Sequence, residues 1–291
     1  MNELEKLRAQ LNQIIDAIII EAKKSSTLTP SVSSVPVPTV DLSTQIKSAF
    51  NSLTNPPVKE KTIFSGYAEP LKWTRNVNCW AKSADLSGTA VCVYGLGGVG
   101  GGTLITKKHV LLANHVPYPS IPFTLYFVDN NNTSYGYKVV RTTRVGNTDI
   151  LIGELETTVS DNLKVYSVMP SNYRSYLSSN IPLLYSDQEK KALIGELGIN
   201  ESIDNSVCIT INPPTNPAYA QYFEPVIVGD SGNPAYTIVN NELVLFGAWY
   251  RNWYNNSGIA TSIPDYIDAI NKVLAPDFKL KVADLSGYKK F

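Results

Sequence analysis

From about residue 61 onward, the chain is a succession of short β-type runs separated by turn signals. The runs are rich in β-branched and aromatic residues, and polar turns such as VDNNNTSYG and VNNE lie between them. Many short strands at this spacing are typical of a β-sandwich or of β-barrels. One helix is predicted over about 264–275, because Pro264 can occupy its first turn and Pro276 stops it. The pattern therefore predicts a mostly β fold that ends in a helix.

The residues before this region divide into two parts by composition. Residues 1–24 carry helix formers with apolar positions at helical spacing, which predicts an amphipathic, coiled-coil-like helix. Residues 25–60 are rich in Ser, Thr and Pro, which predicts an extended linker, interrupted by the short amphipathic piece STQIKSAFNSL. We therefore expect a helix over 1–24, a linker over 25–60 and a folded β domain over 61–291.

Charge and cysteine content exclude several classes of partner. Lys plus Arg equals Asp plus Glu at 25 each, so no nucleic-acid partner is indicated. The three cysteines fit neither a disulfide framework nor a zinc site, and we expect no metal and no cofactor. The N-terminus lacks a cationic signal-peptide region, and the run IIDAIII is too short and too interrupted to span a membrane. We expect no membrane partner, no secretory signal and a reducing intracellular compartment.

A glycine cluster in VCVYGLGGVGGGTLI has the spacing of a dinucleotide-binding loop, Gly95-x-Gly97-x-x-Gly100. Such a loop needs a helix after it and an acidic residue about 20 residues further on. Here a β-type run follows, and Asp129 is the first acidic residue after the cluster. The cluster therefore favours a loop between two strands, and a dinucleotide enzyme is the weakest of the functional alternatives.

The most informative stretch is VIVGDSGNPAY, residues 226–236, in which a Gly-Asp-Ser-Gly turn lies between two β-type runs. It resembles the nucleophile loop of the trypsin-like (chymotrypsin-fold) serine proteases, whose GDSGGP signature it matches except at Asn233. The segment GGTLITKKHVLLANHV resembles the family's approach to its catalytic histidine, which places His115 at that position. The segment NTDILIGEL resembles the family's aspartate strand and places Asp149 there, with Asp129 as a distant rival. The order His115, Asp149, Ser231 is the chymotrypsin order.

The resemblance implies a fold and a set of roles. It implies two β-barrels, at about 85–160 and 165–262, with a catalytic triad of His115, Asp149 and Ser231 between them. In such a triad the imidazole removes the serine proton and the carboxylate orients the imidazole. The backbone N–H groups of Gly229 and Ser231 would form the oxyanion hole. Each triad residue could instead be an ordinary structural residue.

The chain departs from the family at several positions. The base of the primary pocket would fall on Pro225, with Glu224 adjacent if the alignment slips by one residue. Trp249 and Tyr250 would line that pocket, so we expect an uncharged, small or apolar residue on the acyl side of the cleaved bond. No activation cleavage site is present, so Asp230 needs a partner other than a new N-terminus.

These observations together predict a serine endopeptidase that acts on polypeptides. Its N-terminal arm would tether it to an assembly, and residues 2–24 would make it a homo-oligomer or part of a larger particle. Composition and the arm suggest a viral or phage member of the family, located in the host cytoplasm or in the virion. The alternative is a virion structural or attachment protein that keeps the protease fold with little or no activity.

Overall fold

The computed structural model describes residues 6–7, 10–16, 39–68, 71–93, 100–204 and 206–291. The chain forms two units, Met1–Val37 and Pro38–Phe291. In the first unit, residues 10–16 are helical, and the side chains of Leu7, Leu11 and Ile14 are exposed. The rest of the predicted helix over 1–24, and residues 94–99 of the glycine cluster, lie outside the described residues.

The first sheet of the second unit closes on itself. Its six strands run in the order β3-β6-β7-β8-β5-β4, and a bridge between Thr89, just before β3, and Thr103 in β4 joins the two ends. Alternate side chains of β6, namely Phe123, Leu125 and Phe127, point into its core. The strands are β3 (Cys92–Val93), β4 (Thr103–Leu104), β5 (His109–Ala113), β6 (Phe123–Val128), β7 (Ser134–Arg144) and β8 (Ile150–Leu155).

The second sheet has seven strands in the order β13-β10-β11-β12-β15-β14-β9, and an additional pairing of β13 with β14 closes it as well. The β13–β14 hairpin turns at Asn240 and Asn241, which both have positive φ, a conformation that Asn tolerates in tight hairpin turns. The strands are β9 (Ser167–Val168), β10 (Pro182–Ser186), β11 (Ala192–Ile203), β12 (Ser206–Asn212), β13 (Pro234–Val239), β14 (Glu242–Asn252) and β15 (Gly258–Ser262).

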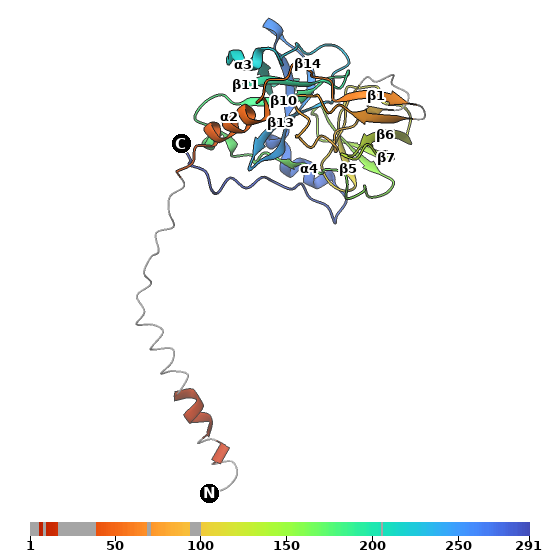
Figure 1. Cartoon of the computed structure of the whole chain (residues 1–291). Helices are drawn as coiled ribbons and strands as arrows, with labels where there is room; N and C mark the ends of the chain where they lie inside the picture. The colour runs from red at the N-terminus through yellow and green to blue at the C-terminus, as the bar shows by residue number, and fades with distance from the viewer. Residues whose placement is uncertain (1–5, 8–9, 17–38, 69–70, 94–99, 205) are drawn as a thin grey trace. The chain divides into compact units, whose positions relative to one another are not determined.

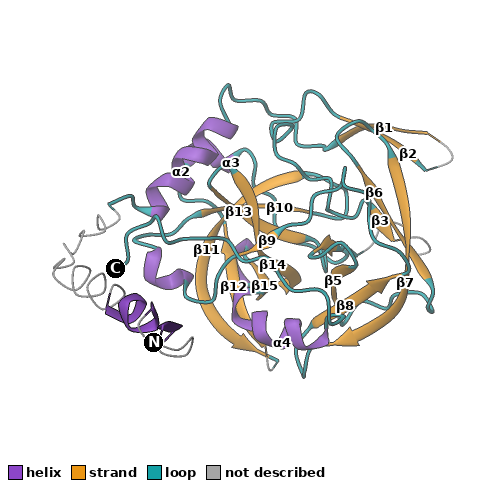
Figure 2. Cartoon of the chain, turned by 90° about the horizontal axis from the view of Figure 1, so that it is seen from below, coloured by secondary structure: helices purple, strands orange, loops and turns teal. Residues whose placement is uncertain are grey.

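The two barrels lie side by side, as Figures 1 and 2 show from two directions, with β5, β6 and β7 on one side and β10, β11 and β13 on the other. Smaller elements surround them: the hairpin of β1 (Phe64–Ala68) and β2 (Lys72–Arg75), the helix α3 (Pro217–Ala220), and the 3-10 turns η1 (Tyr173–Tyr176) and η2 (Tyr254–Asn256).

The helix α2 (Leu42–Leu53) corrects the predicted domain boundary. Composition predicts that this segment is part of an extended linker over 25–60. Its side chains Leu42, Ile46 and Phe50 are instead fully buried in the hydrophobic core that includes the second barrel. Asp41 caps the helix by accepting a hydrogen bond from the Ser43 N–H at 3.0 Å. The folded unit therefore begins near Pro38 rather than at residue 61.

The C-terminal helix consists of the 3-10 turn η3 (Pro264–Tyr266) followed by α4 (Ile267–Val273). Beyond it, the last residues return to the barrels: the Lys289 N–H donates to the Val40 carbonyl at 2.8 Å, and Leu285 and Tyr288 join the core. The predicted mostly β, two-barrel, chymotrypsin-like fold with a C-terminal helix is thus confirmed. No helix within the described ranges is long and apolar enough to cross a membrane.

Candidate active site

His115 and Asp149 meet at the ends of two paired strands. His115 follows β5 and Asp149 precedes β8, and these strands are antiparallel neighbours. The imidazole Nδ1 lies 3.0 and 2.9 Å from the two carboxylate oxygens of Asp149, and the His115 backbone N–H donates to the same carboxylate at 2.9 Å. Asp149 is buried, so its carboxylate holds both the ring and the backbone of His115.

Ser231 approaches the same imidazole from the second barrel. Its Oγ lies 2.7 Å from Nε2 of His115. An ionised carboxylate can only accept hydrogen bonds, so Nδ1 must carry the proton that faces Asp149. In a neutral ring, Nε2 then presents its lone pair to the serine hydroxyl. The three predicted residues are therefore brought into one hydrogen-bonded chain, with the polarity that general-base activation of a serine needs.

The two barrels are joined at this point by several hydrogen bonds. The Asp149 N–H donates to Oγ of Ser206, at the start of β12, at 3.1 Å. On the other side, the N–H groups of Gly100 and Gly101 donate to the carbonyls of Gly229 and Ser231 at 3.0 and 2.8 Å. These contacts fix the serine relative to the histidine, although the two residues belong to different barrels.

Close approach explains the glycine at residue 101. A Cβ at Gly101 would lie 2.4 Å from the Asn233 nitrogen, so only glycine lets this segment touch the serine loop. The described end of the glycine cluster therefore contacts the backbone around the serine.

The serine loop contains the two N–H groups that the sequence assigns to an oxyanion hole. Gly229 has φ +109 and Gly232 has φ +78, which glycine adopts without strain. Among the described residues, the N–H groups of Gly229 and Ser231 have no hydrogen-bond acceptor, whereas those of Asp230 and Gly232 donate to Ile227 and Trp249 carbonyls. The two N–H groups assigned to an oxyanion hole therefore have no acceptor within the described part of the chain.

Asp230 has partners within the chain. Its carboxylate is buried and accepts hydrogen bonds from the N–H groups of Gln188 at 3.0 Å and Ile227 at 2.8 Å. Burial nevertheless raises the pKa of this carboxyl above its usual value. The partner that the sequence analysis left open is therefore backbone in the turn between β10 and β11, together with the loop itself.

Pro225 and Glu224, the two candidates for the base of the substrate pocket, lie in different environments. Pro225 is exposed, so its assignment to the base of a buried pocket is wrong. Glu224 is engaged by Lys61 and Lys191, whose Nζ atoms lie 2.5 and 2.8 Å from its carboxylate. Neither residue offers a buried, unpaired anion to a basic substrate side chain.

Trp249 and Tyr250 lie beside the triad. Trp249 is fully buried, and its backbone N–H and carbonyl bond to Asn233 and Gly232 of the serine loop at 2.9 and 2.8 Å. The Tyr250 ring meets the His115 ring edge-on, with centroids 5.3 Å apart, and its hydroxyl donates to Asp204. Burial and this carboxylate raise the pKa of Tyr250 to about 12.

The second histidine of the chain, His109, and the alternative aspartate, Asp129, both have structural partners. His109 is buried, Nδ1 lies 2.8 Å from Thr106 Oγ1, and Nε2 accepts the Ala275 N–H at 3.2 Å. Burial lowers the pKa of His109, which keeps the ring neutral. Asp129 accepts hydrogen bonds from the N–H groups of Asn131 and Thr133 in the β6–β7 turn and from the Tyr135 hydroxyl, and none of these partners is a triad residue.

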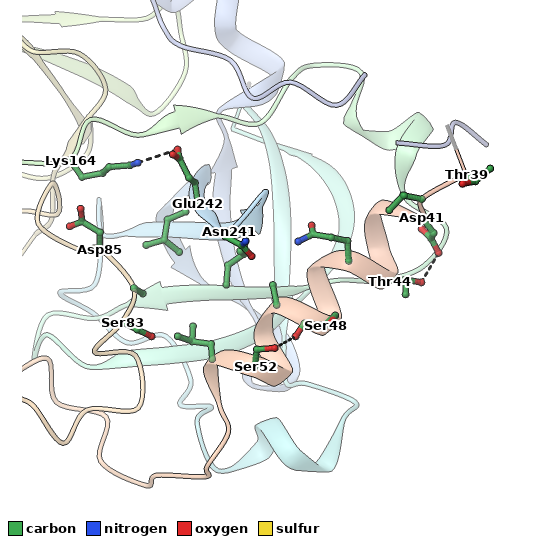
Figure 3. Close-up of a pocket in the computed structure, with 17 residues that line it drawn as sticks. Thr39, Asp41, Thr44, Ser48, Ser52, Ser83, Asp85, Lys164, Asn241 and Glu242 are labelled. Carbon is green, nitrogen blue, oxygen red and sulfur yellow. Dashed lines mark hydrogen bonds and ion pairs between the residues drawn. The ribbon is translucent and has the colours of Figure 1, made fainter. Parts of the chain in front are cut away.

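The described residues form a cavity that lies apart from the triad, and they contain no cluster of metal ligands. A cavity of about 920 Å³ is lined by α2, residues 83–85 and the β13–β14 hairpin, where Lys164 points toward Glu242 (Figure 3); it includes no triad residue. Over the described ranges, no group of His, Cys, Asp and Glu could hold a metal ion. The three cysteines Cys79, Cys92 and Cys208 are free thiols.

Comparison with known proteins gives matches among solved structures alone. No family model matches the sequence, and no curated protein matches it. Among solved structures 543 chains match, one of which is the VesB protease of Vibrio cholerae. The two chains share 18% sequence identity with a TM-score of 0.48, and the match covers 63% of this chain and 62% of VesB, less than two thirds of its length.

Proposed function

We propose that the chain is a trypsin-like serine endopeptidase whose triad is His115, Asp149 and Ser231. The observation that carries the proposal is the continuous contact from the Asp149 carboxylate through the His115 ring to Ser231 Oγ, with separations of 2.9 and 2.7 Å. The N–H groups of Gly229 and Ser231, which have no acceptor in the described ranges, support the same assignment.

The arrangement supports acyl transfer in two steps. Ser231 Oγ would attack the carbonyl carbon of a peptide bond while Nε2 of His115 takes the hydroxyl proton. The carbonyl oxygen becomes an oxyanion, which the N–H groups of Gly229 and Ser231 would stabilise, each by about 3–4 kcal/mol. The imidazolium then returns its proton to the leaving amine. Water, activated by the same imidazole, releases the acyl group from Ser231.

We also place the enzyme in an assembly. The apolar face of residues 7–14 is exposed, and a Ser/Thr/Pro-rich stretch separates it from the folded unit. These features support a role as a tether to a larger particle, and a virus or phage particle is the assembly that the sequence analysis favours.

The experiment that tests the activity is labelling with a fluorophosphonate. In this reaction Ser231 Oγ bonds to phosphorus, fluoride leaves, and His115 accepts the hydroxyl proton. We expect rapid labelling of the wild type and none of Ser231→Ala, with the two proteins unfolding at similar temperatures. Ser257→Ala is the matched control, because Ser257 is a buried loop serine whose Oγ donates to Asn212 and not to a triad residue. Equal labelling of wild type and Ser231→Ala would overturn the proposal, and a folded wild type that is not labelled would favour the structural alternative.

A further inference from the structure

A turn on the second barrel, residues 187–190 between β10 and β11, contacts the serine loop. Of the lysines that the structure describes, only Lys190 is buried, with 8% of its surface exposed. Its backbone has φ +58, and its N–H donates to the Asp187 carbonyl at 3.2 Å. The turn therefore directs a charged side chain inward, which is costly unless the ammonium has a specific partner.

That partner is Asn233, two residues after the candidate nucleophile. The Lys190 ammonium donates to Oδ1 of Asn233 at 2.9 Å, and Asn233 is fully buried. The Asn233 side chain in turn donates through Nδ2 to the Asp230 carbonyl at 3.0 Å, and its backbone N–H donates to the same oxygen at 3.1 Å. A chain of hydrogen bonds thus runs from Lys190 to the peptide unit between Asp230 and Ser231.

A second residue of the turn acts on the neighbouring peptide unit. The side-chain amide of Gln188 donates to the Val228 carbonyl at 2.9 Å, which belongs to the peptide unit between Val228 and Gly229. Gln188 lies so close to this unit that a Cβ at Gly229 would be 2.1 Å from its Oε1. Glycine at 229 therefore permits both the φ of +109 and the approach of Gln188.

The geometry of the peptide bond connects these contacts to the site. In a planar trans peptide unit, the C=O and the N–H point in opposite directions. A hydrogen bond that holds the Val228 carbonyl toward Gln188 therefore directs the Gly229 N–H the other way, and the bonds to the Asp230 carbonyl do the same for the Ser231 N–H. Neither of these two N–H groups has an acceptor among the described residues.

We propose that Gln188 and Lys190 are positioning residues that set the direction of the two oxyanion N–H groups, Gln188 through Val228 and Lys190 through Asn233. The inference rests on the proposed serine-hydrolase function and adds to it the source of the site's preorganisation. Asn233, the one departure from the GDSGGP signature, is the residue that makes the link to Lys190.

The charged groups around Lys190 support the same arrangement. Burial lowers the pKa of Lys190 to about 8, while Asp187 from its own turn, Cys92 from β3 and Asp230 from the serine loop favour the charged form. Near neutral pH the ammonium is therefore charged, and its hydrogen bond to Asn233 is charge-assisted.

The test uses the full-length chain and a fluorophosphonate, whose phosphoryl oxygen takes the place of the oxyanion. Lys190→Met removes the ammonium, and Gln188→Glu removes the amide donor at nearly constant shape. In each variant we expect the maximal rate of phosphonylation to fall about 10- to 100-fold, because outright loss of one oxyanion donor costs about 100- to 1,000-fold. The probe concentration at half-maximal rate should change little. A variant that merely deformed the binding site would instead raise this concentration.

Lys191→Met is the matched control. This lysine is the next residue along the chain, and its ammonium forms ion pairs with Glu189 and Glu224 at 2.6 and 2.8 Å instead of a hydrogen bond to Asn233. It should react at the wild-type rate. A further readout is pH: the wild-type rate should decline above about pH 8 as Lys190 loses its proton, and Lys190→Met should lack this decline.

The outcomes separate this inference from the function on which it rests. If the wild type is not phosphonylated, the proposed function fails before any variant is compared. If the wild type reacts and both variants match it, the positioning role is wrong. If Lys190→Met does not fold, as judged by thermal unfolding, Gln188→Glu tests the positioning role instead, and we expect the same fall in its maximal rate. Gln188 is only partly buried, and its replacement by Glu leaves no cavity.

Discussion

Asp187 is the buried carboxyl in the turn behind the serine loop, with 7% of its surface exposed. Burial raises its pKa from 3.8 to about 6. Between these two pH values the unfolded chain has lost this proton while the folded protein keeps it. The contribution of Asp187 to stability is therefore fully present below about pH 4 and is lost as the pH rises through 6.

Asp187→Asn should remove this dependence. The amide oxygen can still accept the Lys191 N–H, which Asp187 Oδ1 accepts at 2.8 Å. We expect the variant to gain stability relative to the wild type as the pH rises from 4 to 6, measured as the free energy of unfolding in urea at several pH values. Asp161→Asn is the control, because this carboxylate is fully exposed. A constant difference between Asp187→Asn and wild type across this range would contradict the prediction.

We expect Trp249 to limit the size of the substrate side chain next to the serine. Its backbone bonds to the serine loop, and a Cβ at Gly258 would lie 2.3 Å from its ring and 2.8 Å from Val226. The indole therefore fills the space between β15 and the loop that leads to the serine. We expect Gly, Ala or Ser on the acyl side of the cleaved bond, and rejection of Lys and Arg, because a buried cation would have no partner there.

Profiling with a peptide library measures this preference. Trp249→Val should extend it to larger apolar residues at some cost in stability, about 3–5 kcal/mol if the cavity does not collapse. Trp253→Val is the matched control, because that indole is partly exposed under Arg251. A dominant preference of the wild type for Arg or Lys would show that the pocket is built differently.

At this scale, the sequence predicts the nucleophile and its partners better than the residues that support them. Ser231, His115 and Asp149 stand in short motifs whose neighbours resemble a known family. Gln188 and Lys190 stand about forty residues before the serine in a turn with no motif, and their contacts depend on how β10 and β13 pair. Pro225 was misplaced because counting along the chain cannot tell which way an irregular loop turns.

Among the elements, α2 shows how tertiary contacts override a composition signal. Its apolar residues Leu42, Ile46 and Phe50 repeat every four positions, which is the spacing of one helix face. The Ser/Thr/Pro-rich surroundings favoured a linker, because composition averages over a stretch and hides a single short stripe. The hydrophobic surface that receives the stripe is built by strands far away in sequence, which the local pattern does not contain.

Phe50→Ala tests whether α2 belongs to the folded unit. Phe50 is fully buried and contacts the Tyr219 ring, with centroids 6.3 Å apart. Removing the ring should lower the free energy of unfolding by about 3–5 kcal/mol. Ser48→Ala on the exposed face of the same helix should change it by less than about 0.5 kcal/mol. Equal stability of Phe50→Ala and wild type in urea unfolding would show that this segment is part of the linker and not of the folded unit.

For the whole molecule, the two-barrel arrangement follows from strand patterns that the sequence displays plainly. Short alternating runs such as that of β6 predict half-buried strands, and turn residues such as Asn240 and Asn241 mark the hairpins between them. The order of strands within each sheet, and the bridge that closes the first barrel at Thr103, depend on long-range pairing. The site lies where the two barrels meet, so its supporting contacts were the part least accessible to local patterns.

The N-terminal unit leads to a prediction about assembly. The sequence predicts a heptad pattern with Leu4, Leu11 and Ile18 at the a positions and Leu7 and Ile14 at the d positions. Leu7, Leu11 and Ile14 are more than half exposed in the single chain. A helix of this length is marginal alone in water, and Leu at a with Ile at d disfavours dimers. We therefore expect a homo-oligomer, most simply a trimer.

Light scattering on three proteins decides this prediction. Full-length chain should be trimeric, whereas residues 38–291 alone should be monomeric. Leu11→Glu combined with Ile14→Glu places like charges in the proposed seam and should give a monomer at full length. The control, Asn12→Glu combined with Gln13→Glu, adds the same charge on the b and c positions outside the seam and should remain trimeric. A monomeric full-length chain would exclude self-association through this helix, and an oligomer that survives removal of residues 1–37 would locate the contact on the barrels.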